Sequence, residues 1–94
     1  MAGKLEKVLY VEDEADIRAI AELALAKVGG FEVLICASGP EAIDKAASFA
    51  PDIVLLDVMM PGMDGPSTLE ALRALPGLGA VPAVFLTAKA LPAE

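Results

Sequence analysis

The sequence predicts an α/β protein with an open, doubly wound parallel sheet and helices on both faces. Apolar runs typical of buried strands alternate with stretches of helical periodicity, and short connections join them. This alternation implies right-handed crossovers and therefore parallel strands. A chain of 94 residues is long enough for one hydrophobic core and too short for two. We therefore expect a single domain over residues 1–94.

The first strand and the first helix follow each other directly. Val8–Val11 is a short apolar run that stops at acidic residues, which predicts a buried strand. Apolar residues then recur at helical spacing until Gly29 and Gly30, which favour the end of a helix. The residues at this spacing are Ile17, Ile20, Ala21, Ala24, Leu25 and Val28. Phe31–Ile35 predicts the second strand.

A capping box predicts where the second helix begins. Ser38 is followed three residues later by Glu41, a spacing at which each side chain binds the other residue's backbone N–H. This helix should end before Pro51. Ile53–Leu56 is then a run of branched apolar residues without alternation, typical of a strand that is covered on both faces, and it ends at Asp57.

The last part of the chain predicts a loop, a helix and a strand. The stretch from Met60 to Pro66 is rich in proline and glycine and should be neither helix nor sheet. Leucines spaced three apart then indicate one face of a third helix: Leu69, Leu72 and Leu75. Pro76 and Gly77 end that helix, and Ala83–Leu86 predicts a fourth strand that closes at Thr87.

The composition excludes several classes of function. Fourteen acidic residues against seven basic ones give a net charge of -7, which disfavours binding of nucleic acid by this segment. The chain has no histidine and one cysteine, so Ser/His and Cys/His catalytic pairs and an intrachain disulfide are excluded. We expect Cys36 to be a small buried residue. No apolar run is long enough for a membrane span or a signal peptide, which predicts a cytoplasmic location without membrane attachment.

Oxygen-bearing side chains follow three of the four predicted strands. Glu12 and Asp13 follow the first strand, Asp57 the third and Thr87 the fourth. With the strand order 2-1-3-4, these groups meet at the carboxyl edge of the sheet, where ligands bind in open α/β folds. Two carboxylates about 4 Å apart repel by roughly 4 kcal/mol at an effective dielectric constant near 20, so the cluster needs a cation or a proton. An all-oxygen set suits Mg²⁺, and a metal beside a nucleophilic carboxylate suits phosphoryl transfer.

Each of these residues also has a simpler interpretation. Glu12 and Asp13 could be solvated acids at the start of the first helix, where they interact favourably with the helix dipole. Thr87 could be an ordinary strand residue. Three methionines near Asp57 favour loop and core packing over sulfur ligation: Met59, Met60 and Met63.

Three motifs together resemble the receiver domain of bacterial two-component response regulators: VEDE after the first strand, LLDVMMPGMDG around Asp57 and FLTAKA at Thr87. The resemblance extends from Val8 through Lys89. It implies a flavodoxin-like fold, with Asp57 as the phosphoacceptor and Mg²⁺ as the cofactor. It further implies a sensor histidine kinase or a phosphotransfer protein as the partner. The residues implied to hold Mg²⁺ are Glu12, Asp13, Asp57 and the backbone carbonyl of Met59. The residues implied to contact the phosphoryl group and to switch are Thr87 and Ala88.

The chain also departs from the pattern of that family. Receivers continue through a further helix, a fifth strand with a phosphate-pairing lysine and a last helix, and this sequence stops at Glu94. We therefore expect a receiver that is truncated after the fourth strand. Lys89 is a weak candidate for the missing cation. An open edge on Ala83–Leu86 would favour a homodimer or a domain swap.

The sequence thus predicts a phosphoacceptor module that switches a protein-interaction surface, and not an enzyme, although slow self-dephosphorylation fits it. Two other interpretations stay open. One is a receiver-like interaction module that is not phosphorylated. The other is an aspartate-nucleophile phosphatase, which is disfavoured because that class needs a second Asp where this chain has Met59.

Overall fold

The computed structural model describes residues 5–86. Its strands and helices run in the predicted alternating order. They are β1 (Lys7–Val11), α1 (Ala15–Glu22), η1 (Leu23–Val28), β2 (Glu32–Cys36), α2 (Gly39–Phe49), β3 (Ile53–Asp57), α3 (Gly65–Arg73) and β4 (Ala83–Leu86).

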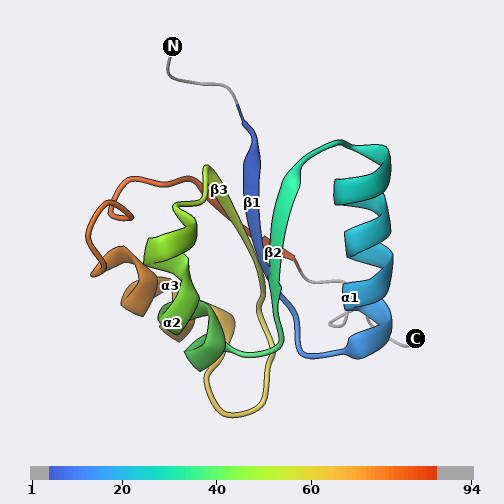
Figure 1. The fold of residues 1–94 in the computed structure, drawn as a ribbon. Helices are drawn as coiled ribbons and strands as arrows, with labels where there is room; N and C mark the ends of the chain where they lie inside the picture. Colours follow the sequence, from blue (N-terminus) through green and yellow to red (C-terminus); the bar gives the residue numbers. More distant parts are fainter. Residues whose placement is uncertain (1–4, 87–94) are drawn as a thin grey trace.

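The strands form one parallel sheet in the order β2-β1-β3-β4, as predicted. Figure 1 shows α2 and α3 on one face of this sheet and α1 on the other. The chain moves from β1 to one side for β2 and to the other side for β3, so the strand order reverses between β1 and β3. The doubly wound, flavodoxin-like fold is confirmed, and the reversal marks where such folds bind ligands.

The hydrophobic core lies between the sheet and the α2–α3 layer. Alternate residues of the two central strands point into it and are almost completely buried: Leu9, Val11, Val54 and Leu56. Ala42 and Ala46, one turn apart on α2, are also fully buried. Their small side chains let α2 lie close to the strands. Cys36 belongs to the same core, which confirms the prediction that it is buried.

The start of α2 differs from the predicted capping box in one bond. The Glu41 N–H donates to Ser38 Oγ at 3.3 Å, as expected. The Glu41 carboxylate, however, accepts from the N–H of Ala37 at 2.8 Å and not from that of Ser38. That hydrogen bond, with further help from Lys45, holds the pKa of Glu41 below its usual value. The two side chains still satisfy backbone donors at the helix start, and only the donor to Glu41 lies one residue earlier than predicted.

The prediction that residues 60–66 contain no helix is wrong at its end, because α3 begins at Gly65 and includes Pro66. Proline is tolerated in the first helical turn, where its missing N–H has no helical partner. Asp64 caps this helix and accepts from the N–H of Ser67 at 2.8 Å. The helix ends at Arg73, so Leu75 lies beyond it.

The first helix is less regular and less buried than its periodicity predicts. After Glu22 it continues as the π-helical segment η1, and the N–H of Gly29 bonds to the carbonyl of Ala24. Neither α1 nor η1 has a fully buried residue, and Ile20 and Val28 are 66% and 81% exposed. This layer packs mainly against β2, which lies at the edge of the sheet, and so leaves apolar residues of the helix exposed.

The amino end of the sheet is held by Asp52. Its Oδ2 accepts from the backbone N–H groups of Glu6 and Lys7 at 3.0 and 2.9 Å, while Lys7 Nζ donates to the carbonyl of Phe49. The two backbone N–H donors lower the pKa of Asp52. These contacts tie the start of β1 to the start of β3 and so help to set the register between the two strands.

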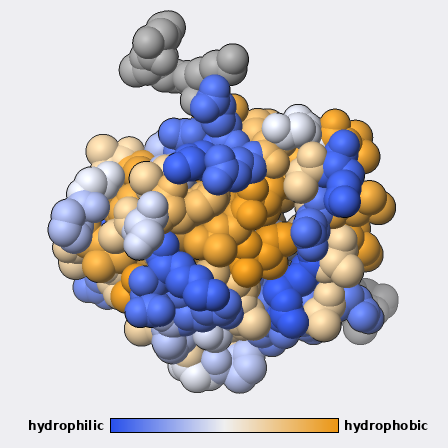
Figure 2. Space-filling view, viewed as in Figure 1, coloured by the Kyte–Doolittle hydropathy of each residue, from blue (hydrophilic) through white to orange (hydrophobic). Residues whose placement is uncertain are grey.

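The space-filling view in Figure 2 shows an apolar area between the helical layers, where Figure 1 has β2 in front. Hydrophilic residues flank this area. It fits the position of β2 at the edge of the sheet, where Val33, Leu34 and Ile35 are half-buried. No helix in residues 5–86 is long and apolar enough to cross a membrane.

Cys36 offers a test of this packing. Burial is the main cause that raises the pKa of its thiol to about 11 from 9.0. At pH 8 this shift lowers the thiolate fraction by about 100-fold. Iodoacetamide should therefore alkylate Cys36 at least about 100-fold more slowly in the native chain than in the urea-unfolded chain. Intact mass measures both rates. Because the folded state favours the neutral thiol, its stabilising contribution should fall as the pH rises through 9 toward 11. Rapid labelling in buffer would contradict the buried position.

Candidate functional site

The register between β1 and β3 brings two acidic residues side by side. Val11 pairs with Leu56, and the next residues along the two strands are Glu12 and Asp57. Paired residues of a parallel sheet lie on the same face. Glu12 and Asp57 therefore meet at the carboxyl edge, at the point where the strand order reverses.

Asp13 completes this acidic cluster. Glu12, Asp13 and Asp57 each place a carboxylate oxygen within 4.8 Å of those of the other two. Glu12 is 3% exposed and Asp57 2%, while Asp13 is half-buried. The interpretation of Glu12 as a solvated residue is therefore wrong. Two almost fully buried carboxylates beside a third carry a high electrostatic cost unless a cation is present.

Backbone and side-chain contacts hold Glu12 in place. Its N–H donates to the carbonyl of Cys36 at 3.0 Å, which extends the β1–β2 ladder by one residue. Its Oε2 accepts from the N–H of Glu14 at 3.1 Å, and its Oε1 lies 3.5 Å from the hydroxyl of Tyr10. The side chain is thus fixed at the turn into α1.

The sequence analysis missed two contributors to this cluster, Tyr10 and Arg18. Tyr10 lies two residues before Glu12, and the two-residue period of a strand could have placed both on one face. Arg18 Nη1 donates to the carbonyl of Glu12 at 3.0 Å. Because helical side chains point back toward the N-terminus, an arginine in the second turn of α1 could have been expected near its start.

The loop after Asp57 packs closely against the strand end. The N–H of Val58 donates to the carbonyl of Leu86, and the N–H of Gly65 donates to the carbonyl of Val58 at 2.9 Å. A Cβ atom on Gly65 would lie 2.4 Å from the Asp57 carbonyl oxygen. Only glycine therefore allows α3 to begin this close to Asp57.

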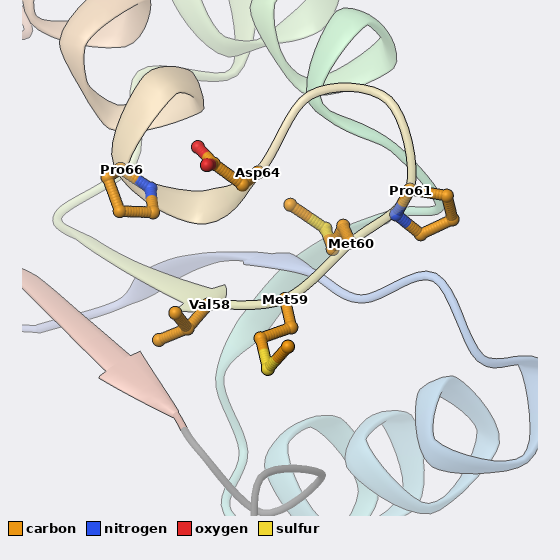
Figure 3. Close-up of a pocket in the computed structure, with 6 residues that line it drawn as sticks. All are labelled: Val58, Met59, Met60, Pro61, Asp64 and Pro66. Atoms are coloured by element: carbon orange, nitrogen blue, oxygen red, sulfur yellow. The ribbon is translucent and has the colours of Figure 1, made fainter.

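An open cavity of about 450 Å³ lies in this loop (Figure 3). Its lining residues are Val58, Met59, Met60, Pro61, Asp64 and Pro66. Figure 3 shows the side chains of Met59 and Met60 on opposite sides of the loop backbone, and Met59 is 61% exposed whereas Met60 belongs to the core. Core packing is confirmed for Met60, whereas the Met59 side chain lies largely exposed on the loop. The Met59 carbonyl as a metal ligand stays a prediction.

The remaining predicted site residues, Thr87, Ala88 and Lys89, lie outside the described residues. Within residues 5–86, β4 ends at Leu86, which pairs with Asp57. The phosphoryl-contact and switch roles therefore stay predictions.

The three clustered carboxylates fit a hard divalent cation. All three donors are oxygen atoms, and their mutual distances allow one small ion to contact more than one of them. Mg²⁺ binds proteins through one or a few carboxylates while keeping some of its waters, and this donor set matches that preference.

Comparison with known proteins gives the family. The sequence model of the family described as "Response regulator receiver domain" matches residues 8–93. The chain belongs to this receiver family. It is therefore a receiver domain of two-component signal transduction systems. Such domains are regulators, generally without enzymatic activity, that interact with histidine kinases or phosphotransfer proteins.

A curated relative, the probable transcriptional regulator ycf27 of Porphyra purpurea, is 41% identical over 88 residues, which are 94% of this chain and 35% of the relative. The chain spans about a third of the length of the curated relatives it matches.

Solved structures agree with this family. The chain resembles the N-terminal domain of a response regulator receiver protein from Methanoculleus marisnigri JR1 with a TM-score of 0.80 and 35% identity, over 97% of this chain and 73% of that one. It also resembles the receiver domain of a sensor histidine kinase from Pseudomonas aeruginosa PAO1, with a TM-score of 0.78 and 30% identity over 96% and 73% of the two chains. That second receiver holds a magnesium ion in its active-site cleft.

Charge repulsion in the cluster leads to a stability prediction. In EDTA, Asp57→Asn should raise the free energy of unfolding by about 1 kcal/mol or more, because it removes one of three neighbouring charges. Mg²⁺ at ten times its Kd should stabilise the original chain by about 1.4 kcal/mol and the variant much less. Urea unfolding with and without Mg²⁺ measures both effects.

The matched control is Asp44→Asn, which makes the same charge change on an exposed position of α2. It should leave the response to Mg²⁺ unchanged. An Asp57→Asn variant that is less stable in EDTA than the original chain would contradict the repulsion argument.

The close approach at Gly65 leads to a second prediction. Gly65→Ala should destabilise the fold by about 1 to 3 kcal/mol, because its Cβ would overlap the Asp57 carbonyl and force α3 away from the strand. Gly79→Ala is the control, since a Cβ there would meet its nearest neighbour at an ordinary 3.7 Å. Equal urea midpoints for the two variants would contradict the close packing.

Proposed function

We propose that Asp57 of this receiver accepts a phosphoryl group from the phosphohistidine of a sensor histidine kinase or a phosphotransfer protein. Glu12, Asp13 and Asp57, with the Met59 carbonyl, hold Mg²⁺ for this transfer. The observation that carries the proposal is the meeting of three carboxylate oxygens within 4.8 Å at the reversal of strand order, in a chain of the receiver family. The magnesium-bound neighbour supports the choice of metal.

The proposed chemistry is a single in-line displacement. A carboxylate oxygen of Asp57 forms a bond to phosphorus while the bond from phosphorus to the donor's imidazole nitrogen breaks, and that nitrogen keeps the electron pair. Bound Mg²⁺ supplies positive charge to the phosphoryl oxygens. Asp57 supplies the nucleophilic oxygen. Glu12, whose carboxylate is oriented by the N–H of Glu14, supplies a further oxygen for the metal.

Residues after β4 carry the proposed switch. Thr87 bonds the bound phosphoryl group through its hydroxyl, the amide of Ala88 lies near the same oxygens, and Lys89 is a weaker candidate for a phosphate-pairing cation. Support comes from the pairing of Asp57 with Leu86, the residue that precedes Thr87 in the chain. Movement of Thr87 toward the phosphoryl group would change the surface near β4 and so alter binding to a protein partner.

In this proposal the chain is a single domain that serves as a substrate of its kinase. It loses the phosphoryl group slowly and does not turn over a substrate of its own. Self-association through β4, an edge strand with exposed Val84 and Phe85 in the described part of the sheet, stays a prediction. A cytoplasmic location also stays a prediction. The unphosphorylated interaction module is the alternative that the next experiment separates.

Exposure to acetyl phosphate with Mg²⁺ tests the proposal. Intact mass should show one phosphoryl adduct, because acetyl phosphate supplies the same group without a kinase. Asp57→Asn should abolish the adduct, and EDTA should reduce it at least about tenfold, since the metal neutralises the transferring group.

Asp44→Asn, with the same charge change away from the site, should be phosphorylated like the original chain. A folded chain that binds Mg²⁺ but forms no adduct would favour the unphosphorylated module.

A further inference from the structure

Arg18 contacts the backbone of the acidic cluster. It lies half-buried on α1, and its Nη1 atom donates to the backbone carbonyl of Glu12 at 3.0 Å. Arg18 therefore binds the backbone of Glu12, and this hydrogen bond does not involve the Glu12 carboxylate. Arg18 also donates its own backbone N–H to the carbonyl of Glu14, which anchors it in the first turns of the same helix.

This bond fixes the peptide group between Glu12 and Asp13. The Glu12 carbonyl and the Asp13 N–H belong to one planar unit, so holding the carbonyl sets the orientation of the Asp13 backbone and thereby the direction of its side chain. On its other side, Glu12 is held by the bond from its N–H to the Cys36 carbonyl at 3.0 Å. The chain is thus restrained on both sides of Glu12 where it leaves the sheet.

The guanidinium also brings a positive charge close to the carboxyl edge of the sheet. Arg18 is one of the groups that lower the pKa of Glu41, at the start of α2, although hydrogen bonds from Ala37 and Lys45 are the larger causes. A positive charge near the cluster would oppose the binding of a cation, whereas a fixed Asp13 would favour it. The two effects differ in sign, so a binding measurement distinguishes them.

We propose that Arg18 is a positioning residue for the magnesium site, and that it holds the Glu12–Asp13 peptide so that the Asp13 carboxylate stays beside those of Glu12 and Asp57. The inference rests on the proposed function, because it takes these acids as the metal site. Groups that orient metal ligands from outside the ligand set commonly change metal affinity by about 10- to 100-fold when they are removed.

The test is a Mg²⁺ titration of Arg18→Met, which keeps the long apolar stem and loses the donor. Tyr10 is the only tyrosine, the chain has no tryptophan, and the Tyr10 hydroxyl lies 3.5 Å from Glu12 Oε1, so intrinsic fluorescence reports binding at the cluster. We expect the Kd for Mg²⁺ to rise about tenfold in Arg18→Met. Arg18→Lys, which keeps a cationic donor, should recover most of the affinity.

Two control variants separate position from charge and from stability. Lys27→Met removes the same charge from η1, near its last turn. Arg73→Met removes a guanidinium that donates to the carbonyls of Gly79 and Val81, in the loop before β4. Both should keep the original affinity for Mg²⁺ within about twofold, since neither contacts the acids.

A measurement without metal completes the experiment. The amides of Asp13 and Glu14 should exchange hydrogen faster in Arg18→Met than in the original chain, and Arg73→Met should leave them unchanged. Tighter Mg²⁺ binding by Arg18→Met would show that its charge dominates and would overturn the inference. Unchanged affinity would overturn it as well while leaving the proposed function intact. Absence of Mg²⁺ binding by the original chain would refute the magnesium site itself.

Discussion

The pairing of β1 with β3 is the constraint on which the rest of the site depends. Asp52 ties the two strands together at their amino ends, and the ladder then carries Glu12 to a position beside Asp57 at the carboxyl end. A slip of one residue would move one of these side chains to the opposite face. Such a slip is costly because the apolar residues between the two ends are strongly buried. The hydrophobic core therefore holds the three carboxylates together against their mutual repulsion.

The two helical layers contribute differently to the site. The α2–α3 side carries the core, and Gly65 lets α3 start in direct contact with the Asp57 backbone, which holds the end of β3 in place. On the other face, α1 and η1 have no buried residue, and the cluster is held by polar contacts from Tyr10 of β1, from Glu14 at the start of α1 and from Arg18 of α1. Elements with few buried contacts open more easily than those in a core. Asp13 lies on the more weakly packed side, which is why one hydrogen bond to its peptide group can matter.

Sequence patterns predicted much of this fold because they depend on local physics. The alternating elements and the parallel sheet follow from apolar runs and short connections, and the meeting of Glu12, Asp13 and Asp57 follows once the order 2-1-3-4 of a doubly wound fold is taken. The predictions were wrong where a neighbour in space decided the outcome. Glu41 bonds to Ala37 because the turn after β2 presents that N–H, and Ile20 is exposed because α1 rests mainly on β2. Helical periodicity shows which residues share one face of a helix. It does not show how much of that face the neighbouring elements cover.

The sequence by itself determined the alternation of strands and helices, the family and the identity of the clustered acids, since each is written in short motifs and in periodicities of two or 3.6 residues. Tertiary structure alone decided that Glu12 and Asp57 are almost fully buried, that Gly65 lies against the Asp57 carbonyl and that Arg18 reaches the Glu12 carbonyl. The physical reason is that burial and close approach depend on the packing of layers whose residues are far apart in the chain, and hydrogen-bond geometry follows from that packing.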